Sequence, residues 1–160
     1  MDGMAHLQDV QYDALLANDR TLGDPGVFSV ERGGRVRLRL INGAASTNMW
    51  IDLDRLQGRL VAVDGMPVRP IEGSRFEFAV AQRLDIILDI PRDGGAWPVF
   101  AVQEGGRSRT GFILAPSGAE IAKLESLATD DYPALGADLE QRLRASNPRK
   151  RPAAAVQLAR

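Results

Sequence analysis

The sequence predicts an all-β protein, a sandwich or a barrel, followed by one or two short C-terminal helices. Short segments between residues 12 and 116 alternate apolar and polar side chains, as strands with one buried face do. Turn signals rich in glycine and proline separate most of these segments. After residue 116 the apolar spacing changes to one typical of helices.

Four segments define the expected core. Residues 35–41 place three leucine or valine side chains on one face and three arginines on the other, and residues 84–90 alternate in the same way with Asp85 and Asp89 outward. Residues 49–53 give a third inward set, and residues 60–63 are nearly all apolar, which predicts a central strand. The predicted core residues are Val36, Leu38, Leu40, Ile51, Val61, Val63, Ile86, Leu88, Val99 and Phe112.

Glycine and proline give the expected boundaries of the strands. Asp64-Gly65 is a hairpin signal, because both residues accept a positive φ. Glycine pairs at 33–34, 94–95 and 105–106 indicate three more turns. Four prolines fall where strands are expected to begin or to lie at an edge, since a missing N–H is tolerated there; they are Pro67, Pro70, Pro91 and Pro98.

We divide the chain into four parts on this basis: a flexible lead-in (1–11), the β-sandwich (12–116), a helical extension (117–146) and a linker or tail (147–160). Within the extension, residues 117–127 carry apolar side chains at helical spacing with Ser117 as the N-cap. Residues 135–144 show a weaker helical pattern. The last part is rich in proline, alanine and basic residues, which is typical of a linker.

Composition excludes several classes of function. The 160 residues carry a net charge of −1 at pH 7, so we expect no nucleic-acid partner and no membrane partner. There is no cysteine, which excludes disulfides, thiolate catalysis and cysteine-bound metals. No apolar run reaches the roughly 18 residues of a membrane span. The first residues lack the apolar stretch of a signal peptide, which fits a fragment and a cytoplasmic protein equally well.

His6 is the one imidazole of the chain. Together with Met1 and Met4 it could hold copper(I) weakly, since thioether and imidazole ligands suit that ion. One histidine does not build a three-histidine centre. We therefore expect a solvated terminus and assign no metal-binding residue in the chain.

The charged residues are interpreted structurally. Arg35, Arg37 and Arg39 could bind a polyanion, but acidic residues balance the basic ones, so we expect a solvated sheet face paired with Asp85 and Asp89. Three aspartates could act as paired acids in hydrolysis, but their separate turn contexts argue against catalysis; they are Asp52, Asp54 and Asp64.

Two further side chains are interpreted here: Arg83 has a structural role, and Trp50 has two possible roles. Arg83 precedes a strand, and we interpret it as an anchor for the loop before it rather than as part of an electron-transfer path. Trp50 is expected on the outer face of its strand. It either covers an inter-domain contact or belongs to a second small core beneath the helical segment.

Five motifs occur in order along residues 12–114. They are Asn-Asp-Arg-Thr (18–21), Arg-Val-Arg-Leu-Arg-Leu-Ile-Asn (35–42), Thr-Asn-Met-Trp-Ile-Asp-Leu (47–53), Val-Asp-Gly-Met-Pro-Val (63–68) and Gln-Arg-Leu-Asp-Ile (82–86). In this order they resemble the middle, cupredoxin-like domain of bacterial three-domain multicopper oxidases, the laccase-like enzymes. The resemblance implies a Greek-key cupredoxin-like β-sandwich.

The resemblance also implies a function. Such enzymes couple oxidation of phenols or metal ions to reduction of dioxygen to water, and their copper is held by His-x-His and His-Cys-His motifs in the outer domains. The chain lacks those motifs. It is therefore expected to be the copper-free middle part, with no catalytic, metal-binding or cofactor-binding residue of its own. The parent enzyme would contain copper and would be periplasmic or secreted.

The same resemblance suggests the partners. A middle domain would contact the flanking cupredoxin domains of the same polypeptide and could self-associate when isolated. Two other interpretations stay open: a copper-free cupredoxin scaffold that binds proteins without oxidase activity, and an unrelated adhesion or carbohydrate-binding sandwich. Aromatic residues make up 6% of the chain, which disfavours the carbohydrate module.

Overall fold

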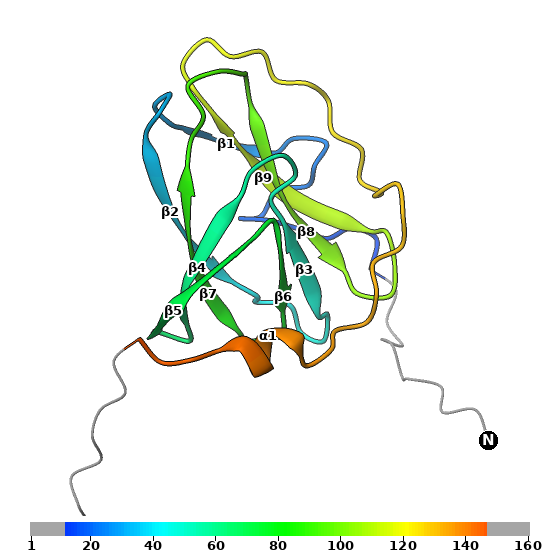
Figure 1. Ribbon diagram of the computed structural model, residues 1–160. Coiled ribbons are helices and arrows are strands. Elements are labelled where there is room, and N and C mark those ends of the chain that lie inside the picture. Colours follow the sequence, from blue (N-terminus) through cyan, green and yellow to red (C-terminus); the bar gives the residue numbers. More distant parts are fainter. Residues whose placement is uncertain (1–11, 147–160) are drawn as a thin grey trace, which may run out of the picture.

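The computed structural model describes residues 12–146 as two packed β-sheets with a C-terminal segment running over one of them (Figure 1). The first sheet has the order β1-β9-β8-β3-β6. Its strands are β1 (Gly26–Ser29), β9 (Arg109–Ala115), β8 (Trp97–Gln103), β3 (Met49–Asp52) and β6 (Arg75–Phe78). Strands β1 and β9 are parallel, whereas the other neighbours in this sheet are antiparallel.

The second sheet is antiparallel throughout and has the order β2-β7-β4-β5. Its strands are β2 (Arg35–Ile41), β7 (Arg83–Asp89), β4 (Gly58–Val63) and β5 (Met66–Gly73). The chain changes sheet repeatedly between β1 and β8, so the predicted Greek-key sandwich of the cupredoxin type is confirmed.

The core lies between the two sheets, where the alternating segments place their apolar side chains. The inward sets of β3 and β7 are buried as predicted. Of the ten predicted core residues, Leu38, Ile51, Ile86, Leu88 and Val99 are buried. Another four are partly buried against the same core; they are Val36, Leu40, Val63 and Phe112.

Val61 does not belong to the buried core, and its prediction was wrong. The pairing of β4 shifts register between Leu60 and Ala62 against both of its neighbours. Burial nevertheless alternates strictly along β4: Leu60 and Ala62 are buried, and Val61 between them is partly exposed. Val61 therefore lies on the face opposite Leu60, and a continuous apolar run does not show which of its residues face the core.

The predicted hairpin between β4 and β5 is confirmed. Asp64 and Gly65 have φ values of 49° and 79°, which are those a two-residue turn with positive φ requires. The Asp64 carboxylate also accepts a hydrogen bond from the backbone N–H of Arg83 at 2.8 Å.

The C-terminal segment differs from its predicted form. No helix forms at residues 117–127. Instead, the backbone there bonds to β9 and the turn before it: the N–H of Arg109 donates to Ser126 at 2.9 Å, and the N–H of Ala128 donates to Arg107 at 2.8 Å. These bonds draw the chain into an extended path, which overrides the helical spacing. One short helix, α1 (Asp138–Arg142), forms within the second predicted stretch. Within residues 12–146, no helix is long and apolar enough to cross a membrane.

Candidate functional site: an apolar pocket beside β2

The arginine stripe lies on the solvated face of the four-stranded sheet, as predicted. Arg35 pairs with Asp89 at 2.6 Å, and Arg37 pairs with Asp85 at 2.7 Å. Arg39 approaches Asp85 more distantly, at 3.7 Å. Hydrogen bonds from Arg35 and from Arg59 of β4 lower the pKa of Asp89. The predicted cross-strand pairs therefore exist, with an excess of guanidinium groups over carboxylates near β2.

The three candidate acids are not assembled into one centre. Asp64 sits in the turn at the far end of β4, while Asp52 ends β3. Asp52 is buried and accepts hydrogen bonds from the phenol of Tyr132 and from Arg75, whose Nε lies 3.0 Å away. Asp54 contributes its backbone N–H to the same carboxylate at 2.7 Å. These three hydrogen bonds tie the Asp52 carboxylate to the C-terminal segment, to β6 and to the turn after β3.

Tyr132 lies in the segment after β9 and packs with its ring beneath the guanidinium of Arg75, 4.7 Å from the ring centre. Burial and the hydrogen bond to Asp52 raise the pKa of Tyr132 to about 12. Tyr132, Phe100 and Val102 belong to a second apolar cluster, against which Trp50 packs. Of the two interpretations of Trp50, the second small core is confirmed, but the segment over it is not helical. The Nε1 of Trp50 donates to the carbonyl of Pro133 in that segment at 2.9 Å.

Arg83 is an anchor, but for a different turn than the one expected. Its guanidinium reaches the carbonyl of Asp64 at 3.4 Å, so it holds the β4–β5 hairpin. The loop before it is closed instead by Gln82, whose side-chain oxygen accepts from the N–H of Ala79 at 3.0 Å. His6 lies outside the described residues.

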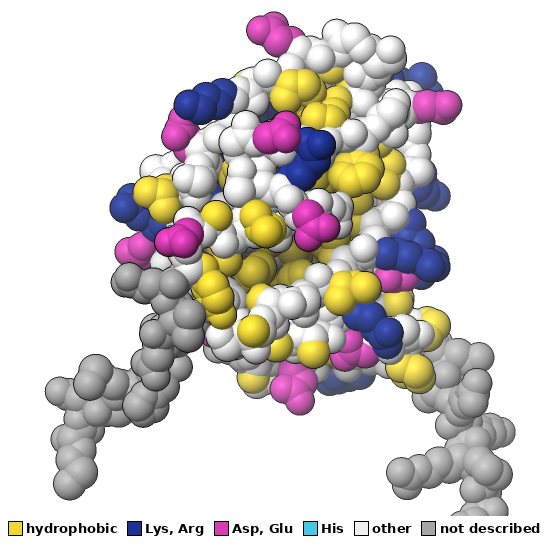
Figure 2. Space-filling view, turned by 180° about the vertical axis from the view of Figure 1, so that it is seen from behind, with side chains coloured by type: hydrophobic (Ala, Val, Ile, Leu, Met, Phe, Trp, Pro, Cys, Tyr) yellow, Lys and Arg dark blue, Asp and Glu magenta, His cyan; other side chains and the backbone are white. Residues whose placement is uncertain are grey.

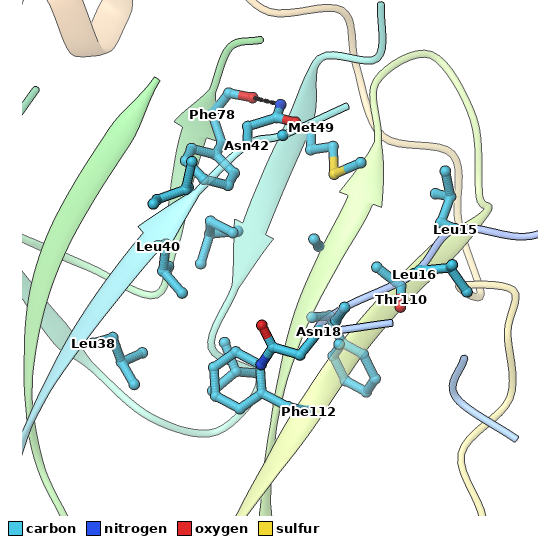
Figure 3. Close-up of a pocket in the computed structure, with 18 of the residues that line it drawn as sticks. Leu15, Leu16, Asn18, Leu38, Leu40, Asn42, Met49, Phe78, Thr110 and Phe112 are labelled. Atoms are coloured by element: carbon cyan, nitrogen blue, oxygen red, sulfur yellow. Dashed lines mark hydrogen bonds between the residues drawn. The ribbon is translucent and has the colours of Figure 1, made fainter. Parts of the chain in front are cut away.

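A pocket of about 770 Å³ opens between β2 and the five-stranded sheet. Its walls carry Leu38 and Leu40 of β2 on one side and Thr110 and Phe112 of β9 on the other, as Figure 3 shows. Residues 12–19 form a further side of the pocket. Seen from behind, the molecule is hollowed over a floor of hydrophobic side chains (Figure 2).

The buried polar side chains at the pocket already have partners. Asn42, at the end of β2, donates to the carbonyls of Thr47 and Phe78 at 2.9 and 3.0 Å and accepts from the N–H of Ala44 at 3.1 Å. No buried side-chain nitrogen or oxygen in the described part of the chain lacks a hydrogen bond. The buried part of the pocket therefore presents apolar surface, without the converging polar side chains with which small-molecule sites fix a ligand.

The pocket was not among the sequence-based candidates. Its one signal in the sequence is Ile41, which continues the outward face of the arginine stripe with an apolar side chain and is 71% exposed. Tyr12, Leu16 and Phe28 are also exposed and line the same pocket. Large exposed apolar side chains that line one pocket are typical of a contact surface.

The donor set does not fit the copper centres of a cupredoxin. Among residues 12–146, no group of three or more histidine, cysteine, aspartate or glutamate side chains could hold a metal ion. A blue copper site uses two imidazoles and a thiolate, and the whole chain contains one histidine and no cysteine. No copper-dependent step can be assigned to these residues.

The two-sheet fold is that of a cupredoxin-like domain. The family model described as "Multicopper oxidase" matches residues 4–117. The chain belongs to the multicopper oxidase family.

Individual relatives agree with this assignment. The chain is 33% identical to the multicopper oxidase MmcO of Mycobacterium tuberculosis over 107 residues, which are 67% of this chain and 21% of that protein. It is 38% identical to copper resistance protein A of Escherichia coli over 80 residues, 50% of this chain and 12% of that protein. The chain thus spans about a fifth or less of the length of these two relatives.

Solved structures share the fold. Fet3p, a multicopper oxidase that functions in iron import, superimposes with a TM-score of 0.57 at 12% identity, over 67% of this chain and 22% of that one. The laccase of Botrytis aclada gives a TM-score of 0.56 at 20% identity, over 66% and 21% of the two chains.

Proposed function

We propose that this chain is a copper-free structural domain of a multicopper oxidase, the middle one of three. The parent enzyme would couple oxidation of phenols or metal ions to reduction of dioxygen to water, in the periplasm or outside the cell. Copper would be held by the other domains. This domain would hold its neighbours at the relative position that electron transfer between their copper centres requires.

One observation carries the proposal: a chain that the multicopper oxidase family matches over residues 4–117 contains one histidine and no cysteine. The copper chemistry of the family therefore lacks its ligands here. What the described residues supply is a packed two-sheet scaffold, in which the buried polar side chains are hydrogen-bonded and the outer face is ion-paired.

The test is copper loading of the purified chain. We expect no intense blue absorption and no oxidation of phenols, even after incubation with copper. Any copper retained should be weakly held by the first eight residues, which contain His6, and should be lost when these residues are deleted. Stoichiometric copper that survives both a chelator and this deletion would overturn the proposal.

A second candidate, favoured by the apolar pocket, is a copper-free scaffold that binds other proteins and whose parent has no oxidase activity. The parent coding sequence separates the two. A His-Cys-His motif elsewhere in the parent supports the oxidase, whereas a parent with the three-domain outline and no such motif supports the scaffold.

A further inference from the structure

Strand β2 is an edge of the four-stranded sheet, and its pairing shows which of its backbone groups are free for another strand. Antiparallel residues alternate between pairs that exchange backbone hydrogen bonds and pairs that do not. Ile90 donates to Gly34 at 2.8 Å and Asn42 donates to Gln82 at 3.0 Å, at the two ends of the β2–β7 ladder. The even-numbered residues of β2 therefore bond to β7. The backbone N–H and C=O groups of the odd-numbered residues from 35 to 41 point away from it.

The other edge of the same sheet is partly covered. In β5, Val68 bridges to Ala145, and the N–H of Arg69 donates to the carbonyl of Arg144 at 2.8 Å. Among residues 12–146, no segment does the same for β2. An exposed row of backbone donors and acceptors is a template for a further strand.

The pocket lies along this free edge. Every residue from 36 to 42 lines it, and residues 12–19 lie on its other side. The space therefore runs along β2 from Val36 to the end of the strand. A strand added beside β2 would direct alternate side chains into the pocket, against Leu38, Leu40 and Phe112.

The charges on the outer face of β2 indicate which residues the added strand should carry on its own outer face. On the outer face Arg35, Arg37 and Arg39 meet two carboxylates, those of Asp85 and Asp89, and Asp89 also pairs with Arg59. A second copy of β2 paired at this edge would set arginine against arginine, which is unfavourable. An incoming strand with acidic or uncharged residues on its outer face would complete the pairing.

We propose that the edge of β2 and the adjoining pocket bind one extended polypeptide strand in which apolar residues alternate with acidic or uncharged ones. This proposal rests on the proposed function for the source of the strand, which is another part of the parent oxidase. Residues 1–11 fit poorly as the occupant, because their larger apolar residues recur every third position rather than every second; they are Met1, Met4, Leu7 and Val10.

The first experiment is amide hydrogen exchange by NMR on the full 160-residue chain. The probe is a synthetic peptide of about nine residues that alternates valine and glutamate, and the control peptide has the same composition with its valines in one block. We expect the alternating peptide to slow exchange at Arg37, Arg39 and Ile41 at least tenfold and to leave β5 unchanged. No protection with the alternating peptide, or equal protection with both, would overturn the proposal.

A matched pair of variants tests the backbone contact. Arg39→Pro removes an N–H that points away from β7, and Arg39→Thr removes the same charge but keeps that N–H. With folding checked by circular dichroism, the proline variant should bind the alternating peptide at least tenfold more weakly than the threonine variant. Equal binding by the two variants would exclude edge pairing.

The source of the strand is tested with overlapping peptides that tile the parent polypeptide outside this chain. At least one of these peptides should bind more tightly than the valine–glutamate probe. If none does, the strand does not come from the parent oxidase and this part of the proposal is wrong. If edge amides become protected as the chain is concentrated, or lose protection when residues 1–11 are deleted, the occupant is a second copy or the chain's own terminus, and the proposal is wrong. Copper retention is measured separately, so it overturns only the proposed function.

Discussion

The phenol of Tyr132 donates a hydrogen bond to the carboxylate of Asp52, and this contact fastens the C-terminal segment to the end of β3. Two neighbouring hydrogen bonds also hold this segment to the sheet. The carboxylate of Glu104 accepts from the N–H of Leu135 at 2.9 Å, and that of Glu77 accepts from the N–H of Gly136 at 2.9 Å. The segment after β9 is therefore held to the five-stranded sheet by side chains of the sheet itself.

Replacing Tyr132 with phenylalanine should destabilise the domain by about 1–3 kcal/mol, the usual result of leaving a buried acceptor short of one hydrogen bond. Urea unfolding measures the change. Tyr12→Phe is the matched control, because Tyr12 is exposed and its hydroxyl contacts only the side chain of Ser46 among the hydrogen bonds in the described chain. If Tyr12→Phe lowered the free energy of unfolding as much as Tyr132→Phe does, the buried hydrogen bond would not be the cause of the loss.

Alkaline pH should weaken the same contact. The pKa of Tyr132 is raised from 10 to about 12 in the folded protein, so folding favours the neutral phenol. The resulting stability is fully present below pH 10 and is lost as the pH rises toward 12, by an amount on the order of 1–3 kcal/mol. Urea midpoints between pH 8 and pH 11.5 measure it. The difference between the native chain and Tyr132→Phe should shrink over this range; a constant difference would contradict the assignment.

The alternation of apolar and polar residues was sufficient to predict β2, β3 and β7, because each has one face toward the core and no irregularity. It failed at Val61, because residues 60–63 are all apolar and the pattern does not show which of them face the core. It also failed at residues 117–127, where hydrogen bonds to residues 107–109 replace helical ones. In both places, contacts between residues distant in the sequence decide which side chains are buried or which backbone hydrogen bonds form.

The pocket could not be predicted from the sequence for a related reason. Apolar residues of β2 read as core, and Leu38 is indeed buried. Whether the space beside β2 is filled depends on whether β2 is an edge strand of its sheet. The order of the strands decides this, and the sequence pattern does not show it. The donor set, in contrast, can be counted directly, so the absence of a cysteine was evident without any structure.

The core should be sensitive to loss of volume at β7. Ile86 is fully buried and pairs with Leu38 and Leu60 on its two neighbours. Ile86→Ala should cost about 2–5 kcal/mol in urea unfolding, because a cavity between the sheets cannot close easily. Ile121→Ala serves as the control, since Ile121 is exposed. A midpoint shift too small to measure in Ile86→Ala would contradict the placement of this strand.

The ion pairs on the outer face should contribute little and should depend on salt. Asp85 accepts two hydrogen bonds from Arg37, at 2.7 and 2.9 Å, and is the more shielded partner. Asp85→Asn should cost up to about 1 kcal/mol in low salt and less in high salt. Asp24→Asn, which disturbs an exposed pair with Arg20, should cost less. If Asp85→Asn lowered the free energy of unfolding equally at both salt concentrations, packing and not charge would be responsible for the loss of stability.

Gly111 of β9 permits a close approach of two backbones. A methyl group there would overlap the carbonyl oxygen of Val99 on β8 and would lie 3.1 Å from the Cα of Phe100. Backbone atoms in the middle of a sheet cannot move aside easily, so Gly111→Ala should destabilise the domain by about 1–3 kcal/mol. Gly43→Ala is the matched control, because a methyl group at Gly43 meets nothing within 4 Å and should change stability by less than about 0.5 kcal/mol. Equal urea midpoints for the two variants would show that β8 and β9 are not packed as closely as described.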